Sequence, residues 1–279
     1  ELSVAILSLL GNGEKTAVSV GNVIGSNIVN ICLIIGLATL LVVLKKRSRN
    51  VKLIPAMAKE EFGSLYSGLF VASLIPLMLV YLTFASQVIG LILVLIFGAY
   101  TYQLSKIRIR QENNQTVSEE TKKKVRLYVG LTLLGVAGVV LSAYFIVESS
   151  VVIAEFAGVS KSIIGATIIA FGTSLPEGSI DVNAFLKGHS GLAFGDVVGS
   201  CFINITLILG ITLLAAPFSV SNITFFTDLV IFSLVANLFL WYFLSMERLG
   251  WKEGMILLFI YILFLATTIG AINLRPPTR

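Results

Sequence analysis

Long apolar stretches dominate the sequence, and several exceed the ~20 residues that a helix needs to cross a bilayer. They lack the alternation of apolar and polar residues that marks the strands of a membrane β-barrel. The pattern therefore predicts an all-α, polytopic membrane protein with about eight full transmembrane helices and a partial one, the segment 1–10. The predicted spans are 17–44, 64–84, 87–106, 125–148, 160–186, 191–215, 222–245 and 252–273.

Composition agrees with this class of protein. The chain is 56% hydrophobic and 13% charged, with a mean hydropathy of +0.95, whereas a soluble domain carries roughly 25% charged residues. The net charge of +5 does not indicate nucleic acid as a partner, because the basic residues cluster in short loops. Cys32 and Cys201 lie within apolar spans, so we expect reduced packing residues there and no disulfide.

The basic residues also predict the orientation in the membrane. One set of alternate loops holds 16 of the 20 Lys and Arg residues and the opposite set holds four. The positive-inside rule then places loops 45–63 and 107–124 in the cytoplasm and the C-terminus outside. We expect a multi-pass protein of the cell (plasma) membrane, and we expect segment 107–124, rich in Glu, Gln, Asn and Lys, to be a solvated loop.

A carboxylate interrupts the span 160–186. Glu177 ends the run Gly172-Thr173-Ser174-Leu175-Pro176-Glu177, and a charge at this depth costs about 3 kcal/mol or more without compensation. Pro176 has no amide hydrogen, so the carbonyl of Gly172 loses its helical partner. A carboxylate, two hydroxyls and freed carbonyls at one depth predict a cation site.

The chain contains one pattern twice. Residues 21–31 and 195–205 match in their glycines, serine, asparagine and isoleucine, and Glu1 and Glu177 precede the two copies. The second helices of the two copies are the first and the sixth of the predicted full spans, an odd offset of five, so the copies run in opposite directions through the membrane. Inverted repeats are a common plan of secondary transporters, whose substrate site lies near the midplane. We divide the single transmembrane transporter domain, 1–279, into a partial first repeat (1–44) and a second repeat (160–215).

The strings Gly-Thr-Ser-Leu-Pro-Glu (172–177) and Gly-Asn-Val-Ile-Gly-Ser-Asn-Ile (21–28) resemble the alpha-repeats of the sodium/calcium exchanger, or cation/Ca2+ antiporter, family of prokaryotic type. The resemblance implies ion ligands from both repeats: Glu1, Ser26, Asn30, the carbonyl of Ala170, Thr173, Ser174, Glu177, Ser200 and Asn204. Family members place a further Gly-Thr-Ser-Leu-Pro string and span before the residue equivalent to Glu1, so we expect an N-terminally truncated sequence.

These oxygens suit Ca2+, which takes 6–8 oxygen ligands. Ser26 and Asn30 share a helix face, as do Ser200 and Asn204, and the two faces should meet across the repeat interface. Gly21, Gly25, Gly195 and Gly199 should form ridges that let the helices approach closely. The resemblance implies a secondary antiporter that exchanges Ca2+ for Na+ by alternating access, with those ions as partners and no cofactor. We expect it to work as a monomer.

Alternatives remain open at this stage. Two desolvated carboxylates close together favour proton binding, so an H+/Ca2+ antiporter is the alternative within the class, and a cation channel or membrane scaffold is the alternative outside it. An enzyme is not expected, because the sequence shows no nucleophile–base pair or metal-ligand histidine set. Asp181 and Asp196 are tentative residues of the ion path. Asp181 could instead be a polar contact near a helix end, and Asp196 an acid placed at a helix N-terminus.

Overall fold

The computed structural model describes residues 1–9, 13–46, 70, 74–78, 86–112, 119–159, 161–215, 223–246 and 249–273, and within these it is helical throughout apart from turns. The predicted all-α membrane fold is confirmed. Six helical stretches are long and apolar enough to cross a membrane, and the apolar stretch Ser86–Tyr102 is the first part of a longer helix. Most of the predicted span 64–84 lies outside the described residues.

The helices follow the predicted spans closely. Their bounds are α1 Leu2–Leu9, α2 Gly13–Ile28, η1 Val29–Ile35, α3 Gly36–Lys46, α5 Ser86–Glu112, α6 Glu119–Ala157, α7 Lys161–Ile164, η3 Gly165–Ile169, α8 Ala170–Lys187, α9 Ser190–Ile203, η4 Asn204–Ile208, α10 Leu209–Ala215, α11 Ile223–Ser245 and α12 Trp251–Asn273. Helix α5 continues to Glu112 and α6 starts at Glu119, so the polar segment 107–124 is helical at both ends.

Three of the long helical columns contain a π-helical segment, labelled η. Segment η1 joins α2 to α3, η3 joins α7 to α8, and η4 joins α9 to α10. A π-helix shifts the backbone hydrogen bonds from the i−4 to the i−5 carbonyl, and such segments occur frequently at functional sites. In contrast, α8 passes through Pro176 without ending.

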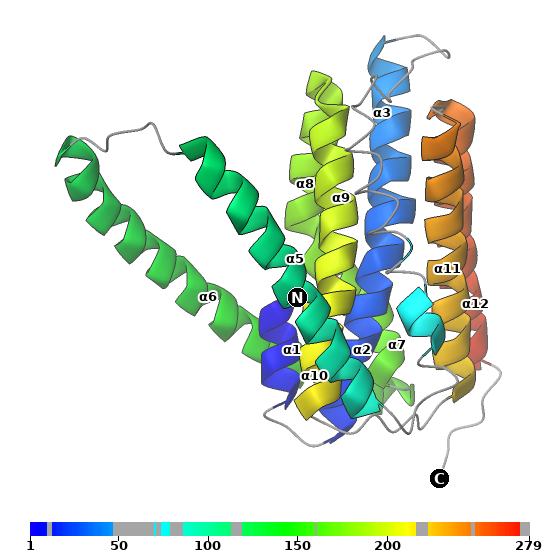
Figure 1. Cartoon of the computed structure of the whole chain (residues 1–279). Coiled ribbons are helices and arrows are strands. Elements are labelled where there is room, and N and C mark those ends of the chain that lie inside the picture. The colour runs from blue at the N-terminus through cyan, green and yellow to red at the C-terminus, as the bar shows by residue number, and fades with distance from the viewer. Residues whose placement is uncertain are drawn as a thin grey trace.

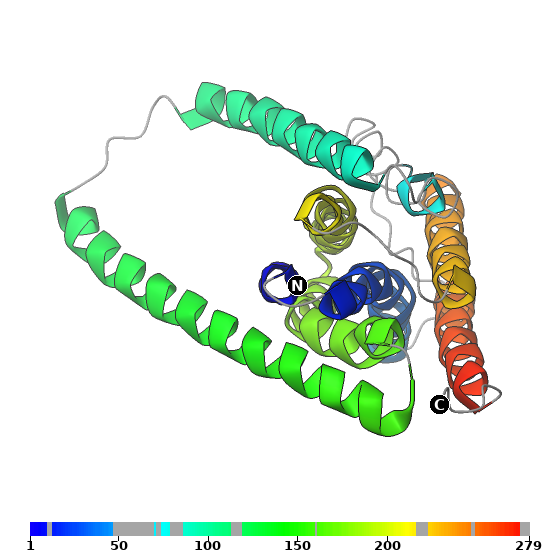
Figure 2. The same cartoon turned by 90° about the horizontal axis from the view of Figure 1, so that it is seen from below.

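The repeat helices form the centre of the molecule. Figure 2 shows α1, α2 and the columns α7–α8 and α9–α10 grouped together, with α11 and α12 along one side and α5 and α6 on the periphery. Burial follows this arrangement, because 67% of the most apolar window of span 17–45 is buried, against 6% for span 129–157 in α6. Helix α6 leans away from the centre, as Figure 1 shows.

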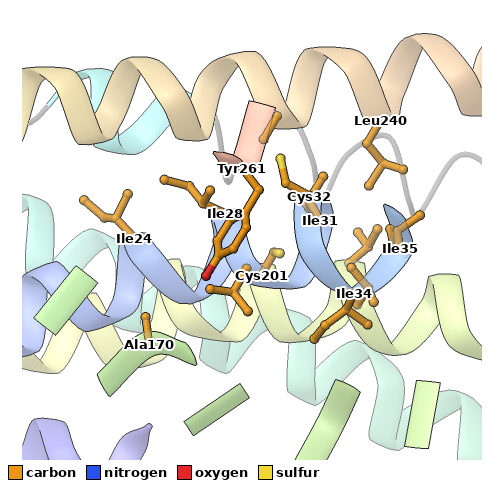
Figure 3. Close-up of a cluster of buried hydrophobic side chains, with 14 of the residues drawn as sticks. Ile24, Ile28, Ile31, Cys32, Ile34, Ile35, Ala170, Cys201, Leu240 and Tyr261 are labelled. Carbon is orange, nitrogen blue, oxygen red and sulfur yellow. The ribbon is translucent and has the colours of Figure 1, made fainter. Parts of the chain in front are cut away.

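The apolar core lies around α2 and η1. Ile24, Ile28, Ile31 and Ile35 are fully buried, and they pack with Leu240 of α11 and other residues shown in Figure 3. Cys32 and Cys201 also lie here, buried and free of a disulfide, as predicted. This apolar core fixes the position of α2. Other faces of α2 carry the polar residues of the candidate site.

Candidate functional site

Glu1 is the residue around which the polar side chains gather. The Ser174 hydroxyl of α8 donates a hydrogen bond to Glu1 Oε1 at 3.3 Å. Ser26 of α2, Asn204 of η4 and Glu177 of α8 also lie beside the Glu1 carboxylate. The structure therefore brings together side chains from α2, α8 and η4, helices of both repeats.

Several buried oxygens of the predicted ligands have no hydrogen-bond partner among the described residues. They include buried atoms of three predicted ligands, namely Ser26 Oγ, Asn30 Oδ1 and Glu177 Oε2. Ser26 and Asn30 are at most 2% exposed. Buried polar atoms are nearly always satisfied, so unsatisfied ones in a native fold need an explanation such as a bound ion. Oxygen-only ligands of this kind suit a hard cation such as Ca2+ or Na+.

Thr173 lies one helical turn before Glu177 on α8, and Ala170 lies about two turns before it. The Thr173 hydroxyl donates to Asn22 Oδ1 at 3.2 Å, and it also lies 3.0 Å from the Ile169 carbonyl and 3.4 Å from the Ala170 carbonyl. Thr173 thus links α8 to α2. Ala170 is fully buried at the start of α8, directly after η3.

The second helices of the two repeats meet through a contact that the sequence analysis did not predict. Asn204 Nδ2 donates to Asn27 Oδ1 at 3.2 Å, so Asn204 contacts the residue three positions before the predicted Asn30. Ser200 is half-buried at the end of α9, and the described residues give its hydroxyl no hydrogen bond. Asn22 and Asn27 both belong to the repeated string. A polar amide within an apolar span is costly, and this could have identified both as candidate site residues.

The π segments begin next to the predicted ligands. Asn30 is the second residue of η1, and Asn204 is the first residue of η4. Segment η3 ends just before Ala170. Each interruption changes the direction of backbone carbonyls near the polar cluster, and the sequence analysis attributed this effect to Pro176 alone.

The predicted glycine ridges differ between the two repeats. A Cβ at Gly21 or Gly25 would clash with backbone oxygens of Ser162 or Ala166, so α2 packs tightly on α7 and η3. Among the described residues nothing lies within 4 Å of a Cβ placed at Gly195 or Gly199. The expectation of close packing is therefore correct for Gly21 and Gly25 and wrong for Gly195 and Gly199, because no described helix covers that face of α9.

The two predicted path residues also come together. Asp181, one turn beyond Glu177 on α8, is buried, and its side chain reaches that of Asp196 on α9. Asp196 itself is exposed. The carboxyls of the two predicted residues thus lie in contact with each other, on the side of Glu177 that faces the α8–α9 turn.

Comparisons with known proteins agree with this architecture. The family model of the sodium/calcium exchanger protein matches residues 1–106 and 127–270. The sodium/calcium exchanger MaX1 of Methanosarcina acetivorans is 38% identical over 134 residues, and the match takes in 48% of this chain and 38% of that exchanger's length. The chain thus spans well under two thirds of this relative.

Two solved structures share the fold. A crystal structure of the H+/Ca2+ exchanger CAX has a TM-score of 0.73 at 16% identity, with 97% of this chain and 72% of that one covered. A structure of the sodium-calcium exchanger NCX_Mj has a TM-score of 0.58 at 22% identity, with 95% and 84% covered. The family match extends over most of the chain, and both repeats lie within it. The chain therefore belongs to the sodium/calcium exchanger family, a class of membrane transporters.

Proposed function

We propose that this protein is a secondary antiporter that exchanges Ca2+ for Na+ across the cell membrane by alternating access. The observation that carries the proposal is the convergence of Glu1, Ser26, Ser174, Glu177 and Asn204 from both repeats. Within this set, Ser26 Oγ and Glu177 Oε2 are buried and unpartnered among the described residues, and so is Asn30 Oδ1, about one turn beyond Ser26. Two carboxylates neutralise one Ca2+ or two Na+, so the same oxygens serve either ion in turn.

Alternating access follows from the inverted repeats. Each repeat supplies a glutamate and a π-interrupted second helix, and the two halves run in opposite directions. A site shared by such halves can open to either side through related movements, as in other transporters with inverted repeats. We place loops 45–63 and 107–124 in the cytoplasm and the C-terminus outside, because the basic residues favour that orientation. One subunit holds both half-sites, so we propose that the monomer is functional.

The coupling ion is tested with purified protein in liposomes. An outward Na+ gradient should drive uptake of 45Ca2+, and collapsing that gradient with an ionophore should stop the uptake. Uptake that responds to a pH gradient and not to Na+ would contradict the proposal and support the second candidate, H+/Ca2+ exchange. The similarity of the fold to the H+/Ca2+ exchanger CAX is the observation that favours this candidate. Ca2+ flux that requires no gradient of Na+ or H+ would indicate a channel.

A further inference from the structure

Asp181 is the most deeply buried acidic side chain of the described spans. It is 1% exposed, and its Oδ2 has no hydrogen-bond partner among the described residues. On one side its helix packs against Ile34 of η1, which fills the space beside Gly178 three residues earlier. An ionised carboxylate in such surroundings requires a positive partner, because the apolar neighbours replace none of its hydration.

The nearest partner of Asp181 is another acid. Helices α8 and α9 reverse direction at Gly188, which has a φ of 88°, and this turn brings Asp196 of α9 within hydrogen-bonding reach of Asp181. The other charged group that acts on Asp181 is Glu177, on its own helix. The described residues show one ion pair, between Lys161 and Glu155, and neither aspartate takes part in it. No described basic side chain therefore neutralises the pair.

Two carboxylates in contact repel each other, so they are stable together only with a cation or a proton between them. All of the available ligand atoms are oxygens, which are the ligands of hard cations. The exposure of the two residues also differs in a useful way. Asp196 is exposed while Asp181 is buried, and Glu177 lies one turn further along α8, so the two aspartates lie between an exposed position and the predicted transport site.

The first repeat shows that the fold itself does not need this acidic pair. Counting from the glutamate of each repeat, Ala5 is the counterpart of Asp181, and in the repeated string Asn22 is the counterpart of Asp196. Ala5 and Asn22 are both buried and neutral. The positions thus accept uncharged residues in the same architecture, and the acids in the second repeat serve a purpose other than packing.

We propose that Asp181 and Asp196 form a second cation site, which binds Ca2+ between the α8–α9 turn and the transport site. A role in holding Ca2+ before it reaches the transport site rests on the proposed exchange, but the ability of the two aspartates to bind Ca2+ does not. With only two carboxylates and one of them exposed, the affinity should be low, at a Kd of about 10⁻⁴–10⁻³ M, the range of weakly charged Ca2+ sites.

Equilibrium binding of 45Ca2+ to the purified protein in detergent tests this site. The Glu177→Gln variant removes a ligand of the transport site, and we expect it to retain a weak Ca2+ site. Adding Asp181→Asn should weaken this residual binding by about tenfold or more, because ligand charge sets the affinity. Adding Asp196→Asn should weaken the residual binding to the same extent, and because this position is exposed the substitution should disturb folding less than Asp181→Asn. Adding Asp228→Asn, an exposed acid on α11, is the matched control and should change nothing.

Two results would overturn the inference. One is Glu177→Gln protein that binds no Ca2+ up to several millimolar. The other is residual binding that survives both aspartate substitutions. The flux assay separates this inference from the proposed function, because a wild-type protein that binds Ca2+ at the aspartates without exchanging it would refute the exchange and leave the site in place.

Discussion

Helices α2 and α9 carry the same Gly-x-x-x-Gly-Ser string, but they use it in different surroundings. In α2, Gly21 and Gly25 face the backbone of α7 and η3 so closely that no side chain fits between them. In α9, the described residues leave Gly195 and Gly199 open. One string thus supports a tight helix contact in one repeat, and in the other repeat none of the described residues lies against its glycines.

The polar residues show a second difference between the repeats. Both copies place an asparagine at the start of a π segment, Asn30 in η1 and Asn204 in η4. At the two counterpart positions the first repeat has the neutral residues Ala5 and Asn22, whereas the second has Asp181 and Asp196. The two repeats therefore share the asparagines at the centre of the molecule, but they differ in charge at the positions on either side of it.

The largest expected effect comes from the residues that the two repeats share. Glu177→Gln and Glu1→Gln should each lower Na+-driven 45Ca2+ uptake by roughly 100-fold or more. Removing one charged partner of a buried ionic contact costs about 3–5 kcal/mol, and each 1.4 kcal/mol corresponds to about tenfold. Uptake into proteoliposomes gives the rate, and size-exclusion elution checks the fold.

Equal losses in the two variants would support two equivalent half-sites. Full uptake by either glutamine variant would remove that glutamate from the ligand set. Asp228→Asn changes an exposed carboxyl on α11 that belongs to neither repeat, and the variant should transport at the wild-type rate.

A smaller effect should distinguish the two glycine ridges. Gly25→Ala places a methyl group against the backbone of Ala166, and overpacking of this kind costs about 1–3 kcal/mol. Gly199→Ala meets nothing within 4 Å among the described residues, so stability should change by about 0.5 kcal/mol or less. Thermal unfolding followed by intrinsic fluorescence measures both variants, and equal losses of stability would show that another element covers Gly199.

The sequence predicted the helices and the polar cluster because those features depend on local composition. The span predicted at 17–44 lies within the helical column of α2, η1 and α3, which runs from Gly13 to Lys46, since a run of apolar residues of this length predicts a membrane helix. Glu177 was identifiable because a carboxylate in an apolar run is costly wherever the helix packs. Asn30 and Asn204 were predicted instead through the repeated string and its resemblance to the family's alpha-repeats.

Features that depend on packing between helices were not predictable from one sequence. A π segment such as η1 changes each hydrogen bond by one residue, and its apolar composition is the same as that of an α-helix. The contact of Asn204 with Asn27 depends on how far η4 rotates relative to α2. The open face at Gly199 depends on which helices lie beside it, although its string matches that of Gly25.

The smallest effect concerns a neutral contact at the other end of the bundle from the acidic pair. Ser19 of α2 and Thr212 of α10 are fully buried, and their hydroxyl oxygens lie 3.1 Å apart. Thr212 donates its only hydroxyl proton to the Ile208 carbonyl at 2.8 Å, so Ser19 is the donor to Thr212. Hydrogen bonds between membrane helices contribute about 0.6 kcal/mol on average, and we expect that coupling in a double-mutant cycle of Ser19→Ala and Thr212→Val.

Thr206→Val is the matched control for this cycle. Thr206 is equally buried and donates to its own helix at the Phe202 carbonyl, 2.7 Å away, so it should show no coupling with Ser19→Ala. Half-saturating Ca2+ for transport should stay within about twofold of wild type in all these variants, because no charge is lost from the ion path. A rise of about tenfold in that concentration, as large as the loss of binding expected for Asp181→Asn, would mean that the Ser19–Thr212 contact also affects ion binding. The acidic pair and the Ser19–Thr212 contact would then not differ in their effect on the ion.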